Sequence, residues 1–230
     1  MIGKVFFDGK DTYAEYGLLL ASKSISLPEV RTNMIDVPGR DGLLDASEVL
    51  TGEATYKNRT IALILTGVDT VSVKKWPATL SDFCNKVHGK RVKVTFPEDT
   101  AHYYSGRCSV GQVEFVKIKQ TIPVTVDCDP WKYKKEKTTV TRADLGTAYK
   151  QLTLPNESRP VIPTITVAQD TVLLWDNNTI NASAGDHIFP AIRLAAGSNS
   201  LKAKVASGTG SITVTYQEHI KNIIQPQKNN

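Results

Sequence analysis

The second half of the chain consists of short runs of β-forming residues separated by turn signals, which recur roughly every 8–12 residues. The runs are rich in Val, Ile, Thr and Leu, and none shows the 3.6-residue period of an amphipathic helix. Many short strands at this spacing predict a β-sandwich or jelly roll. The predicted strands are 164–167, 172–175, 179–182, 191–194, 200–205 and 211–216.

The first half predicts strands and a single helix. Between Trp76 and Val87 the apolar residues fall on one face of a 3.6-residue period. Pro77 stands in the first turn, where its missing N–H costs nothing, and Gly89 stands where a C-terminal cap belongs. A lone amphipathic helix must lie on a sheet, so this half is expected to be a β-sandwich with one helix. The predicted strands are 4–7, 32–37, 60–65, 91–96, 103–110, 112–119 and 120–127.

A domain boundary is expected after Asp129-Pro130-Trp131, because the basic, Thr-rich stretch that follows carries few core residues. We therefore expect a mainly β protein of two domains. The expected boundaries are 1–133 for the first domain, 134–142 for a linker, 143–224 for a β-sandwich and 225–230 for a flexible tail.

Composition and charge limit which classes of function the chain can have. The chain has 40% hydrophobic and 22% charged residues and a net charge of +5, with Lys and Arg spread along it, so a folded protein without a concentrated nucleic-acid footprint is indicated. The densest basic run, Lys132 to Lys137, is either a solvated linker or a phosphate contact. No signal peptide or membrane span is evident, so synthesis in a cytoplasm is expected.

No catalytic constellation is evident, and we predict no catalytic residue, no metal site and no cofactor. The histidines are isolated, and the three cysteines are widely spaced without a CxxC pair. Asp41, Asp45 and Glu48 are close enough in sequence to suggest a glycosidase, but acids in turns more often cap those turns. Trp131 and Trp175 are core aromatics or sugar-stacking platforms, and Trp175 is kept as a candidate carbohydrate contact.

An exposed loop or hairpin tip is expected at Val37-Pro38-Gly39-Arg40. This tetrapeptide fits a type II turn, because Pro38 presets φ at the second position and Gly39 supplies a positive φ at the third. A second turn signal, Asp41-Gly42, follows at once.

Several motifs, in their order and spacing, resemble the N-terminal domain of siphophage distal tail proteins over about the first 133 residues. They are Val37-Pro38-Gly39-Arg40-Asp41-Gly42, the Trp76 helix ending at Gly89, Tyr103-Tyr104-Ser105-Gly106-Arg107 and Cys128-Asp129-Pro130-Trp131.

The second half is similar to the galectin-like C-terminal β-sandwich of the same family. The similarity rests on a predicted strand at Pro190-Ala191-Ile192-Arg193-Leu194, a predicted turn at Gly197-Ser198-Asn199, and the following Leu201 and Ser211-Ile212-Thr213-Val214. The large insertions that some members carry as carbohydrate-binding modules are absent, which weakens a direct role in receptor binding.

The resemblance implies a structural role at the virion tail tip and no enzyme activity. Six N-terminal domains would form a ring around the tail lumen, with the C-terminal domains projecting outward. The implied partners are the tail tube protein, the tail-associated lysin or baseplate hub protein, the tape measure protein and a receptor-binding protein. DNA would only pass through the lumen, without specific contacts, and no membrane is involved.

The resemblance also implies that a hairpin of the N-terminal domain joins neighbouring subunits, and residues 35–49 are our candidate. Arg40 and Asp41 at its tip are either solvated surface or one half of an inter-subunit pair. The candidate interface residues are Val37, Pro38, Gly39, Arg40, Asp41 and Gly42. Two alternatives stay open: another tail tube or baseplate hub subunit, and a carbohydrate-binding tail module that recognises the host cell wall.

Overall fold

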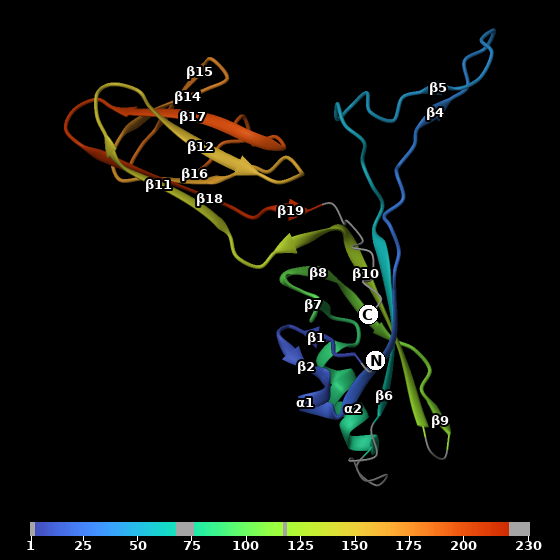
Figure 1. Ribbon diagram of the computed structural model, residues 1–230. Coiled ribbons are helices and arrows are strands. Elements are labelled where there is room, and N and C mark those ends of the chain that lie inside the picture. The colour runs from blue at the N-terminus through green and yellow to red at the C-terminus, as the bar shows by residue number, and fades with distance from the viewer. Residues whose placement is uncertain (1–2, 68–75, 117–118, 221–230) are drawn as a thin grey trace, which may run out of the picture. The chain divides into compact units, whose positions relative to one another are not determined.

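The computed structural model describes residues 3–67, 76–116 and 119–220. The chain divides into two compact units, Met1–Lys132 and Tyr133–Asn230, coloured blue to green and yellow to red in Figure 1. The predicted flexible tail, 225–230, lies outside the described residues.

Except for a separate hairpin at residues 34–45, the strands of the first unit form one sheet in the order β2-β1-β7-β8-β10-β6-β3, with β9 paired to β10. All neighbouring strands with a described register run antiparallel. The strands are β1 (Phe6–Phe7), β2 (Lys10–Asp11), β3 (Leu18–Ile25), β6 (Arg59–Gly67), β7 (Arg91–Phe96), β8 (Asp99–Val110), β9 (Glu114–Val116) and β10 (Lys119–Lys134).

The core of the first unit arises from strands in which buried and exposed residues alternate. In β6 the side chains of Ile61, Leu63 and Leu65 are buried, and the residues between them are not. Period-2 alternation places every second side chain on one face of a sheet, so this face covers the core. The predicted strands 60–65 and 91–96 are confirmed.

The predicted helix is confirmed as α2 (Trp76–Val87). It buries Trp76, Phe83 and Val87, and the Phe83 ring packs edge-on against Tyr16 at a centroid distance of 5.4 Å. Gly89, which follows the helix, has a φ of +72°, as expected for a helix cap.

A second helix, α1 (Thr12–Tyr16), was not predicted, so the expectation of one helix is corrected to two among the described residues. Five residues are too few to show a helical period. Its signals lie instead in its caps, since the Asp11 side chain accepts a hydrogen bond from the Tyr13 N–H and Gly17 has a φ of +65°.

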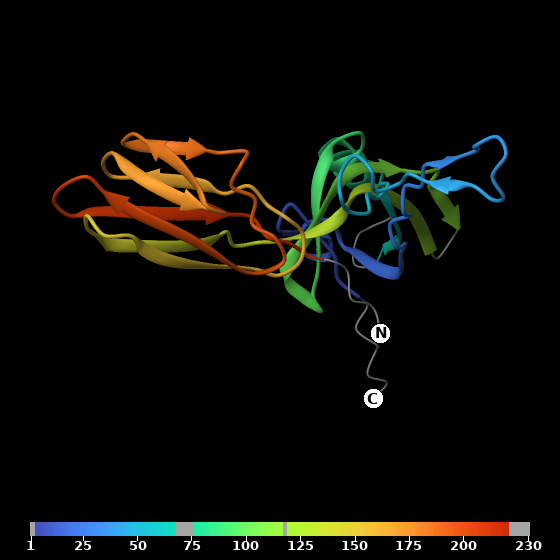
Figure 2. The ribbon, with the colours of Figure 1, turned by 90° about the horizontal axis from the view of Figure 1, so that it is seen from above.

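The second unit is a β-sandwich, visible as two stacked sheets in Figure 2. One sheet has the order β11-β18-β13-β16 and the other β12-β17-β14-β15, and their inner faces share one hydrophobic core. The strands are β11 (Thr138–Leu145), β12 (Lys150–Asn156), β13 (Thr164–Val167), β14 (Thr171–Trp175), β15 (Asn178–Ala182), β16 (Gly185–Ile188), β17 (Gly197–Val205) and β18 (Gly210–Tyr216), followed by β19 (His219–Ile220).

The strand predicted at 191–194 is wrong. Ile192 donates its N–H to the Phe189 carbonyl in a turn, and Leu194 forms only an isolated bridge with Val161. Ile192 and Leu194 are nonetheless fully buried, so their apolar pattern reflects core packing without a sheet ladder. The turn predicted at 197–199 is also wrong, since these residues begin β17.

Part of the predicted linker, 134–142, is strand. Residues 138–142 belong to β11 and pair with β18, because residues 138–141 are all β-branched and Val140 packs against the core. The strands β12 and β16 were not predicted.

Gly106 in β8 lies against the backbone of β10. A Cβ at this position would stand 2.4 Å from the Asp127 carbonyl oxygen and 2.6 Å from the Cys128 Cα. Neither backbone atom can move aside without disturbing the β8–β10 pairing. We predict that Gly106→Ala lowers the free energy of unfolding of the first unit by about 1–3 kcal/mol, measured by urea denaturation.

Gly146→Ala is the control, because a Cβ there meets nothing within 4 Å. Its expected change is below about 0.5 kcal/mol. Equal losses in the two variants would contradict the close approach of β8 and β10.

Candidate assembly interface

Residues 26–58 form an arm that leaves the sheet of the first unit after β3 and returns at β6 (Figure 1). Near its far end β4 (Met34–Ile35) pairs antiparallel with β5 (Leu44–Asp45). The arm therefore contains the hairpin expected at 35–49, but it is more than twice as long as that hairpin.

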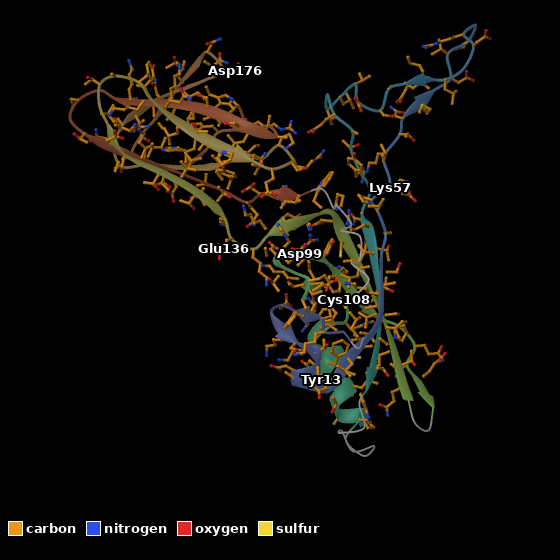
Figure 3. The ribbon with its side chains drawn as sticks, in the orientation of Figure 1. Tyr13, Lys57, Asp99, Cys108, Glu136 and Asp176 are labelled. Atoms are coloured by element: carbon orange, nitrogen blue, oxygen red, sulfur yellow. The ribbon has the colours of Figure 1, made fainter. Side chains whose placement is uncertain are left out.

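Backbone hydrogen bonds join the two sides of the arm along its lower part. The Ser26 N–H donates to the Thr60 carbonyl at 3.0 Å, and the Lys57 N–H donates to the Glu29 carbonyl at 2.8 Å. The Lys57 ammonium also pairs with the Glu29 carboxylate at 2.9 Å; Figure 3 labels Lys57.

An aromatic contact fixes the arm at its root. The ring of Tyr56 packs edge-on against Trp131 of β10, with the centroids 5.0 Å apart. Trp131 is 7% exposed, so it is a packing residue at this position.

The tip of the arm has the predicted turn. The Arg40 N–H donates to the Val37 carbonyl at 3.1 Å, and Gly39 has a φ of +83°, both of which define a type II turn. Arg40 and Asp41 lie midway between β4 and β5, are exposed, and form no ion pair within the described part of the chain.

No residue of the arm is buried, and its apolar side chains are exposed. Leu50 is 96% exposed and Val49 75%. Outside the arm, Tyr13, at 41%, is the only exposed large hydrophobic residue among the described residues of the first unit. The exposed large hydrophobic residues of the arm are Leu27, Val30, Met34, Ile35, Leu43, Leu44, Val49 and Leu50.

This arrangement indicates a surface that becomes covered in an assembly. A two-stranded hairpin without a core is marginally stable alone, and a run of exposed apolar side chains marks an interaction surface. Sequence reasoning found the turn at the tip but missed these apolar residues, because Leu43-Leu44 and Val49-Leu50 have the same composition as core segments.

Asp45 and Glu48 take part in local turns near the tip, Asp45 through its carboxylate and Glu48 through its backbone carbonyl. Asp45 accepts a hydrogen bond from the Ser47 N–H at 2.9 Å, and hydrogen bonds from the Ser47 side chain and backbone lower the pKa of Asp45. Because a glycosidase acid needs a raised pKa, Asp45 is unsuited to that role. The Glu48 carbonyl accepts from the Gly52 N–H in a turn.

Cys108 and Cys128 are protonated packing residues. Burial raises the pKa of Cys108 and of Cys128 to about 12, so neither thiol is a nucleophile near neutral pH. Cys108 lies in the interior of the first unit (Figure 3).

The described histidines have separate local partners. His88 Nδ1 accepts from the Val110 N–H, His102 Nδ1 lies 2.5 Å from an Asp99 oxygen, and His187 Nε2 lies 2.6 Å from the Ser183 carbonyl. Within the described residues no group of three or more His, Cys, Asp or Glu side chains is placed to hold a metal ion.

Trp175 and the basic run 132–137 are the remaining candidates from the sequence. Trp175 is partly buried and packs against the core of the second unit, which favours a structural role. In the basic run, Lys132 pairs with Asp99 and Lys134 with Glu218, which leaves Lys135 and Lys137 exposed. None of the helices described is long and apolar enough to cross a membrane.

No model of a known protein family matches the sequence, and no curated protein matches it. A solved structure does match along nearly the whole chain: SPP1 Dit (gp 19.1), described as a paradigm of the hub adsorption apparatus in Gram-positive infecting phages. It has a TM-score of 0.66 and 17% identity, over 94% of this chain and 99% of that chain.

The match to SPP1 Dit shows a shared fold, and the resemblance to distal tail proteins is confirmed at that level. A second structure, a de novo designed double-stranded β-helix, matches 36% of this chain and 100% of its own at 12% identity. Its TM-score of 0.27 is too low to indicate a common fold.

Because no side chain of the arm is buried, the arm can be shortened without loss of core packing. We predict that replacing residues 33–53 with Asn-Gly leaves the melting temperature of the first unit unchanged or slightly higher, since no buried side chain is lost and a long loop is shortened. The Tyr56–Trp131 contact at the root is kept in this variant. Calorimetry checks the result, and loss of cooperative unfolding would mean that the arm supports the core.

Proposed function

We propose that this chain is a structural distal tail protein of a long-tailed bacteriophage, made in the host cytoplasm and located at the tail tip of the virion. The observation that carries the proposal is the fold shared with SPP1 Dit, which accounts for both units of the chain. A tail tube subunit is usually one compact domain, so the two-unit plan favours the distal tail protein over a tube subunit.

The mechanism is binding without catalysis. Six copies form a ring through residues 1–133, and each arm packs its exposed apolar side chains on the neighbouring copy. In a ring each subunit presents one surface to a different surface of its neighbour, so a protruding arm suits this head-to-tail contact. Covering the arm removes the apolar surface that the single chain exposes.

The ring connects the tail tube to the tail-associated lysin or baseplate hub, with the tape measure protein and a receptor-binding protein as further partners. DNA passes through the lumen without specific contacts. The second unit is expected to be galectin-like. In support of binding without catalysis, the thiols of Cys108 and Cys128 are protonated, and hydrogen bonds from Ser47 lower the pKa of Asp45, so these three groups are unsuited to hydrolase chemistry.

We predict a native mass of about 150 kDa, six times the 25.2 kDa of the chain, with ring-shaped particles in negative stain. The double variant Val49→Ser, Leu50→Ser is expected to weaken assembly at least about tenfold, because each apolar side chain gains about 1.5–3 kcal/mol on burial. Its monomer stability changes little, since both residues are exposed. Light scattering over a dilution series measures the mass.

Ile188→Ser is the matched control, because Ile188 is 67% exposed but belongs to the second unit. Equal assembly by the wild type and the arm variant would exclude the arm as the interface. A wild-type monomer at all concentrations would count against the ring itself.

The charged tip gives a separate prediction. Arg40→Glu reverses a charge that has no ion-pair partner in the described part of its own chain, so the monomer should keep its melting temperature. If Arg40 forms a bidentate pair with a neighbour's carboxylate, reversal weakens the ring in low salt and less so in high salt. Sedimentation velocity at two salt concentrations measures this, and an unchanged mass at both would remove Arg40 from the interface.

A further inference from the structure

Glu218 is a buried carboxylate at the point where the chain leaves the second sandwich. It stands between β18 and β19, and it is 3% exposed. A carboxylate in such a place is costly unless charges and hydrogen bonds compensate for its lost hydration.

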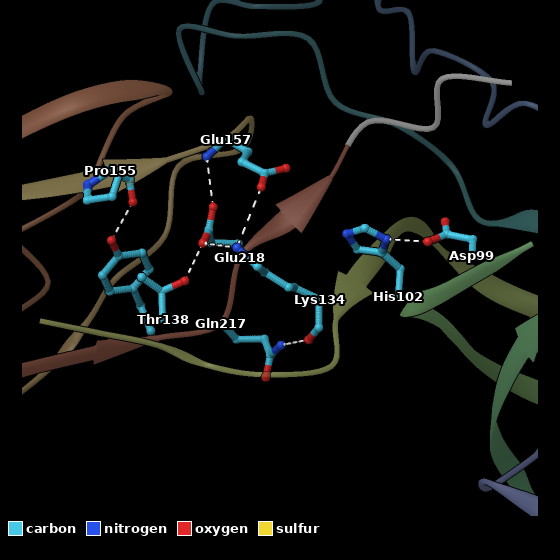
Figure 4. Close-up of polar contacts among 9 residues, drawn as sticks. Asp99, His102, Lys134, Thr138, Pro155, Glu157, Gln217 and Glu218 are labelled. Carbon is cyan, nitrogen blue, oxygen red and sulfur yellow. Dashed lines mark hydrogen bonds and ion pairs between the residues drawn. The ribbon is translucent and has the colours of Figure 1, made fainter. Parts of the chain in front are cut away.

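Three groups from two other segments compensate for it (Figure 4). Thr138 at the start of β11 donates its hydroxyl, the Lys134 ammonium lies at 3.0 Å, and the Glu157 N–H after β12 donates at 3.0 Å. The carboxylate thus bonds the segment that enters the sandwich, the loop after β12 and the segment that leaves the sandwich.

Backbone contacts reinforce the same connection. The Lys134 N–H donates to the Glu218 carbonyl at 3.2 Å, and the Gln217 side-chain amide donates to the Lys134 carbonyl. The Tyr216 hydroxyl donates to the Pro155 carbonyl. The entering segment, 133–138, and the leaving segment, 217–220, are therefore joined by the Glu218 carboxylate and by hydrogen bonds between Lys134 and residues 217 and 218.

The charged surroundings consist of few groups. Lys134 faces the carboxylate and also lies 3.5 Å from the Glu157 carboxylate. From β18 the Tyr216 hydroxyl interacts with Glu218, which together with burial raises the pKa of Tyr216 to about 12. From β19 His219 follows directly, with its ring edge-on to Tyr133 at 4.8 Å. Lys134 thus compensates the Glu218 charge.

We propose that Glu218 is an acid-sensitive clasp: its ionised carboxylate holds segments 133–138 and 217–220 together, and its protonation releases both segments while the sandwich stays folded. The core strands of the sandwich do not depend on this carboxylate, because their inner faces pack through apolar side chains. The clasp controls only the two segments by which the sandwich is attached to the rest of the chain.

The direction of the pH dependence follows from the pKa. Burial raises the pKa of Glu218, but hydrogen bonds from Thr138, Lys134 and the Glu157 N–H outweigh burial and hold the pKa below its usual value. A lowered folded-state pKa stabilises the clasp above the usual carboxyl range, and this contribution is lost as the pH falls through the folded-state pKa. Opening therefore belongs to the acidic range below about pH 4.5.

The test uses the full chain and Glu218→Gln, which removes the charge at nearly constant size. At pH 7.5 the variant should be cleaved by trypsin after Lys134, Lys135 and Lys137 at least about tenfold faster than the wild type, since cleavage follows the population of the opened segment. Glu136→Gln is the matched control, because Glu136 is an exposed carboxylate in the same segment (Figure 3).

Hydrogen exchange of the wild type, corrected for intrinsic rates, is followed from pH 7 down through the acidic range until the core strands β13 and β17 lose protection. Loss of protection in 133–138 and 217–220 at a higher pH than in the core strands, reproduced at pH 7 by Glu218→Gln, supports the clasp. Loss of protection in these segments only together with β13 and β17 overturns it.

Lys134→Met keeps the test decisive if Glu218→Gln does not fold. This variant leaves the carboxylate but removes its cation, so opening should move to a pH about one unit higher than in the wild type. An unchanged opening pH would show that the Lys134–Glu218 pair does not control the segments.

Discussion

The central pairing of β6 with β10 determines the first unit, because both strands contribute side chains that are almost fully buried. Ile61 and Leu63 in β6 and Val124 and Val126 in β10 have at most 1% exposure. The register Val124↔Leu63 fixes which residues face the core, and a slip by one residue would expose all of them. Gly106 lets β8 approach the other side of β10. The arm is inserted between two strands of this sheet, so its root is placed as firmly as the sheet itself.

The arm differs from the sheet because its large apolar side chains are mostly exposed. Ordering its residues costs conformational entropy, and burial offsets this cost in the sheet but not in the arm. Backbone bonds such as Ser26 to Thr60 and the turn at Gly39 define the shape of the arm, while Val49 and Leu50 remain in water. An ordered segment that exposes its apolar groups gains free energy when another surface covers them. This gain is the physical basis for proposing an assembly.

Local signals made much of this structure predictable. The α2 helix, the strand 91–96 and the type II turn at Gly39 follow from period, alternation and turn chemistry, all of which act within a few residues. Which apolar residues are exposed does not follow from such local signals. Leu43-Leu44 in the exposed arm and Ile192 in the buried turn are equally apolar, and only the neighbouring strands decide which of them is covered. For the same reason the length of the arm and the short helix α1, which depends on its caps, were not predicted.

The two units differ in how their buried polar groups are bonded and in where their apolar side chains are exposed. In the second unit the buried polar side chain of Asn156 donates to the Leu194 carbonyl, and Glu218 accepts from three groups in two other segments, so these groups hold separate segments together. In the first unit the buried thiols of Cys108 and Cys128 are neutral, Nε and Nη1 of the buried Arg59 have no hydrogen-bond partner among the described residues, and the exposed apolar side chains lie mainly on the arm. Its exposed apolar side chains gather on the arm, so the arm is the part of the first unit that is suited to contact with another chain.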